Sequence, residues 1–316
     1  MNIFITGGSG FLGGHLINGL RGEHRILALA RSERSAAIIR ERGAEPVSGA
    51  LDTLSAEQLQ DIDVIIHAAA HVEEWGPLAD FEAANVTGTE RLLEAARAAG
   101  VPRFVHISTN AVVVQNADQL GVDEDYSPSG RLPFHYATTK AAAERAVLAA
   151  NSPELFTLAL RPCFIWGPGD TTLLPAIAAM AEQGRFMWLD GGRKSVSTTH
   201  VDNLVHAVRL SLTQGRGGEA YFIADEDDLT LRAFVSGLAQ TRGIALPETS
   251  VPGALVRPVA GIVESTWVAL GIQRDPPVTR MAASLMSTAM TVRTDKARRE
   301  LAWAPVVDRS AGLAAL

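Results

Sequence analysis

The sequence has a single cysteine, Cys163, among 316 residues. One thiol cannot form an internal disulfide or build a cysteine-based metal site. We therefore expect a protein of a reducing compartment, the cytoplasm, that binds no metal. The first residues, "MNIFITGG", lack the basic segment and the longer apolar run of a secretion signal, which agrees with that expectation.

The chain also lacks an excess of basic residues, because 35 aspartates and glutamates outnumber 28 lysines and arginines. The net charge of −7 gives no basic surface for a nucleic acid, so we expect no such partner. The most apolar later stretch, residues 251–272, is interrupted by Arg257, Pro258 and Glu264. This interruption predicts a helix that packs in or on the protein rather than a membrane span.

Short apolar runs alternate with helical patterns over the first half of the chain. The strand-like runs are residues 2–7, 24–31, 63–70, 103–109 and 156–167, and the helical patterns between them are 10–21, 34–43, 81–100 and 135–150. This alternation predicts an α/β fold with a doubly wound parallel sheet. Residues 218–224 read as a strand that returns to the sheet, and the chain from about Asp225 reads as helices and loops.

We therefore expect two parts. Residues 1–165, with about 200–224, would form a dinucleotide-binding domain. Residues 166–199 and 225–316 would form a smaller, mainly helical C-terminal lobe that binds the substrate.

Three glycines lie between the first predicted strand and the first predicted helix. Gly7 would permit the tight turn, Gly10 would let a pyrophosphate approach the backbone, and Gly13 would let the helix pack closely on the strand. Free N–H groups at the helix N-terminus, at Phe11 and Leu12, would hold the phosphate. A glycine-rich turn without a ligand is the alternative, but its position between strand and helix favours a dinucleotide site.

The end of the second predicted strand bears on the choice between NAD and NADP. It carries Arg31, Ser32 and Arg34, and the first carboxylate after the strand is Glu33. A carboxylate at the strand end accepts hydrogen bonds from the ribose of NAD, whereas an arginine accommodates the extra phosphate of NADP. The sequence favours NADP(H), leaves NAD(H) possible, and leaves open that these residues are ordinary surface charges.

Tyr136 and Lys140 are four residues apart on a predicted helix, so their side chains share one face. Taken alone, that spacing fits a solvent-exposed face equally well. Other motifs accompany it: "TGGSGFLG", "HAAA" (67–70), "NVTGTERLLEAA" (85–96), "FVHIST" (104–109), "YATTK", "LRPCFIWGPGD" (160–170), "THVDNLVHAV" (199–208) and "TDKARRELAWAP" (294–305). With them, nearly the whole chain resembles the extended branch of the short-chain dehydrogenase/reductase superfamily. It is most similar to the NAD-dependent epimerase/dehydratase and 3β-hydroxysteroid dehydrogenase-like group.

The resemblance implies a Rossmann-type domain and catalysis by a Ser/Thr–Tyr–Lys set. Thr109, with Ser108 a weaker candidate, would bind the substrate oxygen, and Tyr136 would be the general acid and base. Lys140 would lower the pKa of the phenol and hold the nicotinamide ribose. Further contacts with the cofactor are implied at Leu51, Ala68, Ala69, Ala70, Asn85, Pro162 and Cys163.

Several of these residues have plainer interpretations. Asn85 could be a helix N-cap, and Cys163 could be a small packed thiol. We expect His67, His106 and His200 to pack or form hydrogen bonds rather than bind a metal. His135 could border the substrate.

The sequence departs from the nucleotide-sugar members of the group. Phe164 takes the place of an asparagine, Val196 that of an arginine which grips the diphosphate, and Ala50 that of an acidic residue near adenine, for which Asp52 is a doubtful substitute. A substrate diphosphate would be buried without its partners, which is costly.

These departures predict an NAD(P)-dependent oxidoreductase that interconverts a ketone and a secondary alcohol on a mainly apolar small molecule. A nucleotide-sugar epimerase or dehydratase and a non-catalytic, dinucleotide-binding redox sensor are the alternatives. A homodimer through helices 80–99 and 136–150 is possible.

Overall fold

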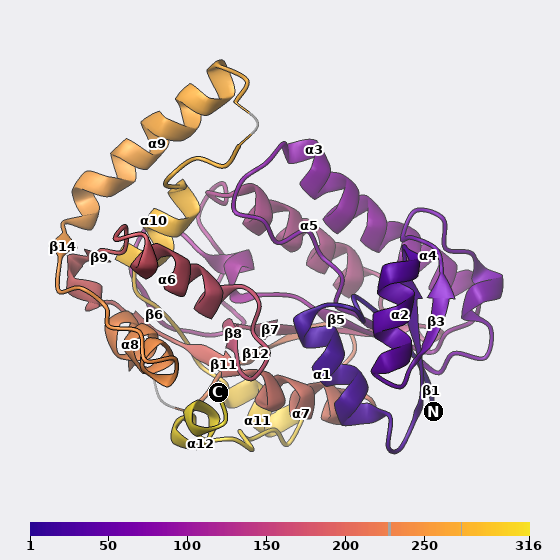
Figure 1. Ribbon diagram of the computed structural model, residues 1–316. Coiled ribbons are helices and arrows are strands. Elements are labelled where there is room, and N and C mark those ends of the chain that lie inside the picture. The colour runs from indigo at the N-terminus through magenta and orange to yellow at the C-terminus, as the bar shows by residue number, and fades with distance from the viewer. Residues whose placement is uncertain (227–228, 273) are drawn as a thin grey trace.

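The centre of the molecule is a seven-stranded parallel sheet in the order β12-β7-β5-β4-β1-β2-β3 (Figure 1). This computed structural model describes residues 1–226, 229–272 and 274–316. The strands are β1 Asn2–Thr6, β2 Arg25–Ala30, β3 Glu45–Ser48, β4 Val64–His67, β5 Arg103–Ile107, β7 Phe156–Pro162 and β12 Glu219–Ile223. β1 pairs with β2 on one side and with β4 on the other. The strand order therefore reverses at β1, which confirms the predicted doubly wound, Rossmann-type sheet.

Helices cover both faces of this sheet because successive strand residues point to opposite sides. In β1, Ile3 and Ile5 pack in one apolar layer and Phe4 packs in the other. α1 (Phe11–Leu20), α2 (Glu33–Glu41), α7 (Val201–Ser211) and α11 (Asp295–Glu300) contribute to the first layer. α4 (Gly88–Ala98) and α5 (His135–Ala149) contribute to the second.

The segment before α4 is helical throughout, but it is not one regular helix. α3 (Leu78–Phe81) leads into a π-helical stretch, Glu82–Thr87, which continues into α4. Short 3₁₀ turns lie at Ala56–Leu59, Asn110–Val113 and Asp190–Gly192.

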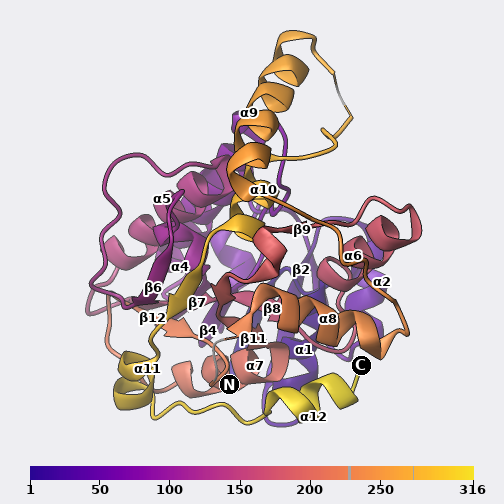
Figure 2. The same cartoon turned by 90° about the vertical axis from the view of Figure 1, so that its left-hand side faces the viewer.

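The smaller part of the molecule lies at the β12 side of the sheet and combines helices with short strands (Figures 1 and 2). Its helices are α6 Leu173–Glu182, α8 Leu231–Thr241, α9 Gly253–Ala269, α10 Arg280–Ser287 and α12 Arg309–Ala314. Its strands are β6 Gln119–Val122, β8 Phe164–Trp166, β9 Trp188–Leu189, β10 Ser195–Val196, β11 Thr198–His200, β13 Leu229–Thr230, β14 Ser250–Val251 and β15 Met290–Val292. They form the sheets β13-β10-β15-β6, β11-β8 and β14-β9.

Strands in this part differ from the expectation of helices and loops after Asp225. β13, β14 and β15 are two or three residues long, too short to show the alternation that identifies a strand in a sequence. The division into two domains remains our proposal. Residues near the C-terminus, Ala297, Leu301 and Trp303, pack in the apolar layer of the main sheet.

Candidate active site

The predicted site residues follow the carboxyl ends of six neighbouring strands of the main sheet. The glycine turn follows β1, Arg31 follows β2 and Leu51 lies beyond β3, while Ala68 follows β4 and Thr109 lies just beyond β5. Pro162 ends β7. Because all six strands are parallel, these positions lie along a single edge of the sheet. The edge includes the point beside β1 where the strand order reverses, which is where open α/β sheets bind ligands.

The glycine turn has the geometry that each glycine predicts. Gly7 adopts a φ of 77°, which favours glycine. A Cβ on Gly13 would lie 2.1 Å from the carbonyl oxygen of Gly7, so only glycine fits there. A Cβ on Gly10 would meet only that same oxygen, at 3.4 Å, and Gly10 is exposed. No side chain caps the N-terminus of α1, where Phe11 and Leu12 present their N–H groups, so the turn fits a pyrophosphate.

Arg42, which the sequence did not predict as a site residue, binds the backbone of this turn. Nη1 of Arg42 donates hydrogen bonds to the carbonyl oxygens of Gly8, at 2.6 Å, and Gly10, at 2.8 Å. The guanidinium also lies against Gly14, where a Cβ would be 2.8 Å from Cζ. Arg42 follows α2, and only the packing of α2 on the sheet brings it to the turn. Its position in the sequence gave no signal.

The residues after β2 divide into two groups. Ser32 is the N-cap of α2, and its hydroxyl and that of Ser35 form a reciprocal capping box. Arg31 and Arg34 are exposed, and neither forms an ion pair with another described residue. The neighbouring Glu33 instead pairs with Arg40, at 2.7 Å. Two guanidinium groups are therefore free beside the strand end.

The end of β4 provides a half-buried surface of small side chains, Ala68, Ala69 and Ala70. Ala69 N–H donates to the hydroxyl of Thr6, at 3.0 Å, which joins this strand end to β1. Leu51 packs on the start of α4, where its Cδ1 would lie 3.0 Å from a Cβ on Gly88. Contact of these residues with a cofactor stays a prediction.

Asn85 lies within the π-helical stretch, is 2 % exposed and does not cap a helix. Its Oδ1 accepts from the backbone N–H of His71, at 2.7 Å, and its Nδ2 donates to the backbone oxygen of His71 and to Oγ1 of Thr139, both at 3.1 Å. Asn85 thus ties the loop after β4 to α5. A direct contact with the cofactor stays a prediction.

Thr109 and Tyr136 lie within hydrogen-bonding reach of each other, and the catalytic roles implied for them and for Lys140 stay a prediction. Thr109 is the N-cap of the 3₁₀ turn after β5, and its Oγ1 accepts from the N–H of Ala111, at 3.1 Å. Tyr136 is in the first turn of α5 and Lys140 is one turn later. Burial raises the pKa of the Tyr136 phenol above its usual value, and a hydrogen bond with Thr109 partly opposes this rise. The phenol is therefore protonated at neutral pH.

Lys140 is 3 % exposed, and its ammonium contacts two residues of β5. Its Nζ donates to the backbone oxygen of Ile107, at 2.7 Å, and lies 3.3 Å from Nε2 of His106. Burial lowers the pKa of Lys140 to about 8, against a smaller opposing effect of Glu144. In this arrangement the ammonium does not lower the pKa of Tyr136, contrary to the expectation from the sequence.

The buried histidines are neutral hydrogen-bonding residues. Burial lowers the pKa of His67 to about 3, and burial together with the charge of Lys140 also lowers that of His106. His67 lies between the hydroxyls of Thr6, at 2.7 Å, and Thr89, at 2.9 Å. His200 caps α7 by accepting from the N–H of Asp202. Residues 1–226, 229–272 and 274–316 contain no cluster of three His, Cys, Asp or Glu side chains that could hold a metal.

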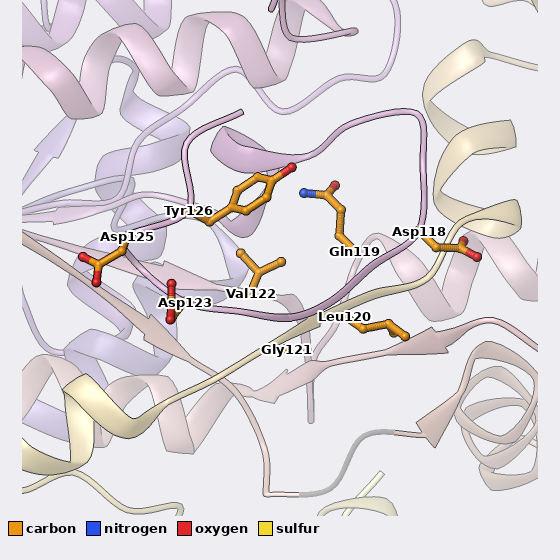
Figure 3. A pocket seen from close by; sticks show the side chains of 8 residues that line it. All are labelled: Asp118, Gln119, Leu120, Gly121, Val122, Asp123, Asp125 and Tyr126. Atoms are coloured by element: carbon orange, nitrogen blue, oxygen red, sulfur yellow. The ribbon is translucent and has the colours of Figure 1, made fainter. Parts of the chain in front are cut away.

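A surface hollow lies elsewhere. It has a volume of about 430 Å³ and is lined by β6 and the loop after it, residues 118–126 (Figure 3). The side chains of Tyr126 and Gln119 point to one side of the chain trace and that of Leu120 points to the other. None of the predicted site residues lines this hollow.

Comparison with known proteins agrees with the geometry. Residues 4–252 match the model of the 3-beta hydroxysteroid dehydrogenase/isomerase family. The chain belongs to this family.

Two relatives are similar to this family member over their full length. A 4-hydroxy-2-methyl-3-oxo-4-farnesyl-3,4-dihydroquinoline-1-oxide ketoreductase of Stigmatella aurantiaca is 42% identical over 100% of this chain and 96% of its own. A 2-alkyl-3-oxoalkanoate reductase of Stenotrophomonas maltophilia is 36% identical over 99% of this chain and 97% of its own. These similarities identify the protein as an NAD(P)-dependent oxidoreductase.

Solved structures share the fold. The crystal structure of gox2253 is 28% identical, with a TM-score of 0.80 over 99% of this chain and 96% of that chain. A UDP-glucuronic acid 4-epimerase of Bacillus cereus in complex with NAD is 20% identical, with a TM-score of 0.76 over 100% of this chain and 97% of that chain. The epimerase likeness concerns the fold alone.

At the end of β7 and in the strands beyond it, this family member has apolar side chains where residues that bind a diphosphate were considered. Pro162 and Cys163 are buried, and Cys163 N–H donates to Oγ1 of Thr199, at 2.9 Å. Phe164 packs on the apolar cluster around Trp166, and Val196, at 1 % exposure, is part of that cluster. Both side chains therefore pack in an apolar core. No helix of the described part of this chain combines the length and apolarity needed to cross a membrane.

Proposed function

We propose that this protein reduces a ketone to a secondary alcohol on a mainly apolar small molecule, with NADPH as the preferred cofactor. The observation that carries the proposal is the position of the Tyr136 phenol, within hydrogen-bonding reach of Thr109 at the sheet edge that bears the glycine turn. The names of the ketoreductase and oxoalkanoate reductase relatives support the same reaction.

The bound nicotinamide would supply the hydride that adds to the carbonyl carbon. Tyr136 gives its phenolic proton to the carbonyl oxygen as negative charge develops there. Thr109 donates a hydrogen bond to the same oxygen and holds it within reach of the phenol. Lys140, fixed by Ile107 and His106, would hold the ribose of the nicotinamide and so position the hydride donor.

The proposed substrate is apolar because Phe164 and Val196 occupy positions that would otherwise bind a diphosphate. Reaction of a charged nucleotide sugar would place a diphosphate against buried apolar side chains. The nucleotide-sugar epimerase therefore remains the second candidate, favoured only by the shared fold.

The function is tested by a screen of apolar ketones with NADPH and NADH, beside UDP- and dTDP-glucose. We expect cofactor oxidation with apolar ketones and no conversion of the nucleotide sugars. Nucleotide-sugar conversion without net cofactor use would replace the proposal with an epimerase. Tight dinucleotide binding with no turnover of any carbonyl would favour the redox sensor.

The preference for NADPH is proposed from Arg31 and Arg34, which are exposed and unpaired among the described residues. Replacement of both by alanine removes two forks of N–H donors, so the Kd for NADPH should rise by about tenfold or more while that for NADH stays the same. The control is Arg40→Ala on α2, because Arg40 is already paired with Glu33. An equal loss for both cofactors would overturn the preference.

We further propose a cytoplasmic homodimer without a nucleic-acid partner. α4 and α5 lie side by side on one face of the sheet (Figure 1), and the guanidinium of Arg97 joins them through the backbone oxygen of Ala150, at 3.0 Å. The outer surfaces of these two helices are the proposed dimer contact. Sedimentation velocity of the purified protein tests it.

A further inference from the structure

Arg42 is a cation that has no carboxylate partner within ion-pair distance among the described residues. It directly follows α2 and is half-buried. Burial lowers the pKa of Arg42 below its usual value, and the charge of the neighbouring Glu41 only partly opposes this. A charge removed from water is costly unless a partner compensates it. The positive charge of Arg42 is therefore available to a negative group that binds nearby.

The partners of this guanidinium are backbone oxygens of the turn between β1 and α1. Nη1 donates to the carbonyl oxygens of Gly8, at 2.6 Å, and Gly10, at 2.8 Å. In a planar trans peptide, the C=O group and the N–H group that follows it point in opposite directions. The N–H groups of Ser9 and Phe11 therefore point to the side of the turn away from Arg42. No described residue accepts a hydrogen bond from either N–H.

The N-terminus of α1 also lacks a negative partner. No side chain caps it, and its first turn contains no acidic residue. The N-terminus of an α-helix carries a partial positive charge of about half an elementary charge. The Arg42 guanidinium lies against the first turn of this helix, because a Cβ on Gly14 would be 2.8 Å from its Cζ. The charge of Arg42 adds to that of the helix end, so the turn as a whole favours an anion.

We propose that Arg42 is a positioning residue for the pyrophosphate of the dinucleotide. It acts through the turn, because its bonds to Gly8 and Gly10 direct the free N–H groups toward the ligand side and its charge favours phosphates there. The inference rests on the cofactor site proposed at this turn. It differs from the proposal for Arg31 and Arg34, which concerns only the extra phosphate of NADP.

NADPH and NADH carry the same pyrophosphate, so Arg42 should act on both alike. Fluorescence titration of wild type and Arg42→Met with each cofactor measures this effect. We expect the Kd for NADPH and the Kd for NADH to rise by the same factor, about tenfold or more. The matched control is Arg40→Met, which removes the same charge from α2 at an exposed residue already paired with Glu33. It should bind both cofactors as wild type does.

Salt dependence separates a role of the charge from a merely structural role. Dissolved salt screens the attraction between a cation and phosphates, so the wild-type Kd should rise with salt more steeply than that of Arg42→Met. Arg42→Lys keeps the charge and should restore the steep dependence and most of the affinity. If circular dichroism shows that Arg42→Met unfolds, Arg42→Gln takes its place. That variant keeps an N–H donor without the charge and should show the same shallow dependence.

Three results would overturn the inference. They are unchanged Kd values in Arg42→Met, a loss confined to NADPH, and an equal loss in Arg42→Lys and Arg42→Met with the salt dependence of wild type. The second would place the guanidinium on the extra phosphate of NADP, and the third would make it a structural part of the turn. A wild type that binds neither cofactor would refute the cofactor site together with this inference. Binding without turnover of any ketone would refute only the proposed reaction.

Discussion

At the scale of single residues, Lys140 is a buried cation whose pKa lies only a little above neutral pH. Burial lowers its pKa to about 8, whereas burial raises that of Tyr136. The ammonium therefore loses its proton as the pH rises through about 8, while the phenol keeps its proton. We predict that kcat/KM for ketone reduction falls as the pH rises through about 8. Titration of an ordinary tyrosine would place this fall at a higher pH. An alkaline limb near 10 would contradict this role of Lys140.

His106 should set where that limb lies. Its Nε2 is 3.3 Å from the ammonium of Lys140 and, as a neutral acceptor, favours the charged form. His106→Phe removes the acceptor and leaves the site apolar, so the alkaline limb should move to lower pH. His24→Phe, near the N-terminus, is the control and should leave the profile unchanged. An unchanged limb in the His106 variant would show that this hydrogen bond has no effect on the titration.

Site residues could be predicted from the sequence where they lie close together in the chain. Tyr136 and Lys140 share a helix, so their proximity follows from four residues of sequence. Arg42 and His106 could not be found this way, because their partners at Gly8 and Lys140 are 34 residues away in the chain. Such contacts depend on how α2 and α5 pack on the sheet.

At the scale of elements, two glycines of the turn between β1 and α1 have different roles, one in folding and one in cofactor binding. Gly13 is needed for folding, because a Cβ there would lie 2.1 Å from the Gly7 oxygen. Gly10 is exposed, and a Cβ there meets nothing closer than 3.4 Å. We predict that Gly13→Ala lowers the free energy of unfolding by roughly 2–4 kcal/mol.

Gly10→Ala should instead leave stability within about 1 kcal/mol of wild type and weaken dinucleotide binding by about tenfold or more, because the new methyl group keeps a pyrophosphate from the backbone. Urea unfolding and fluorescence titration with NADPH measure the two effects. Unchanged NADPH affinity in Gly10→Ala would show that the pyrophosphate does not bind at this turn.

The longer elements were predictable because their apolar patterns repeat over several turns or strand residues. The doubly wound parallel sheet followed from that alternation. The π-helical stretch before α4 was not predictable, since Asn85 within it bonds the backbone of His71 and the hydroxyl of Thr139, and Thr139 is 54 residues away in the chain. The same limit applies to three short strands that are defined by pairing with distant segments: β13 pairs with β10, β14 with β9, and β15 with both β10 and β6.

At the scale of the whole molecule, a buried ion pair joins α5 to the sheet. The carboxylate of Glu144 on α5 accepts from Nη2 and Nε of Arg161 on β7, at 2.6 and 2.9 Å. Both side chains are nearly inaccessible, at 5 and 11 % exposure. Glu144→Ala leaves a buried guanidinium without its partner, so we predict a loss of roughly 3–5 kcal/mol of stability.

The exposed pair of Glu33 and Arg40 is the control for this prediction. Glu33→Ala should cost less than about 1 kcal/mol, because exposed pairs are screened by water. Urea unfolding compares the two variants. A loss of similar size in both would mean that the pair between α5 and β7 contributes no more than a surface contact.

The central claim is that the phenol of Tyr136 delivers the proton that accompanies hydride transfer. It is tested most directly by single-turnover oxidation of bound NADPH by a ketone substrate, in wild type, Tyr136→Phe and Tyr126→Phe. We predict a hydride step slower by about 10²–10⁴-fold in Tyr136→Phe, with unchanged affinity for NADPH, and a wild-type rate in Tyr126→Phe. A Tyr136→Phe rate within a few-fold of wild type would contradict the account.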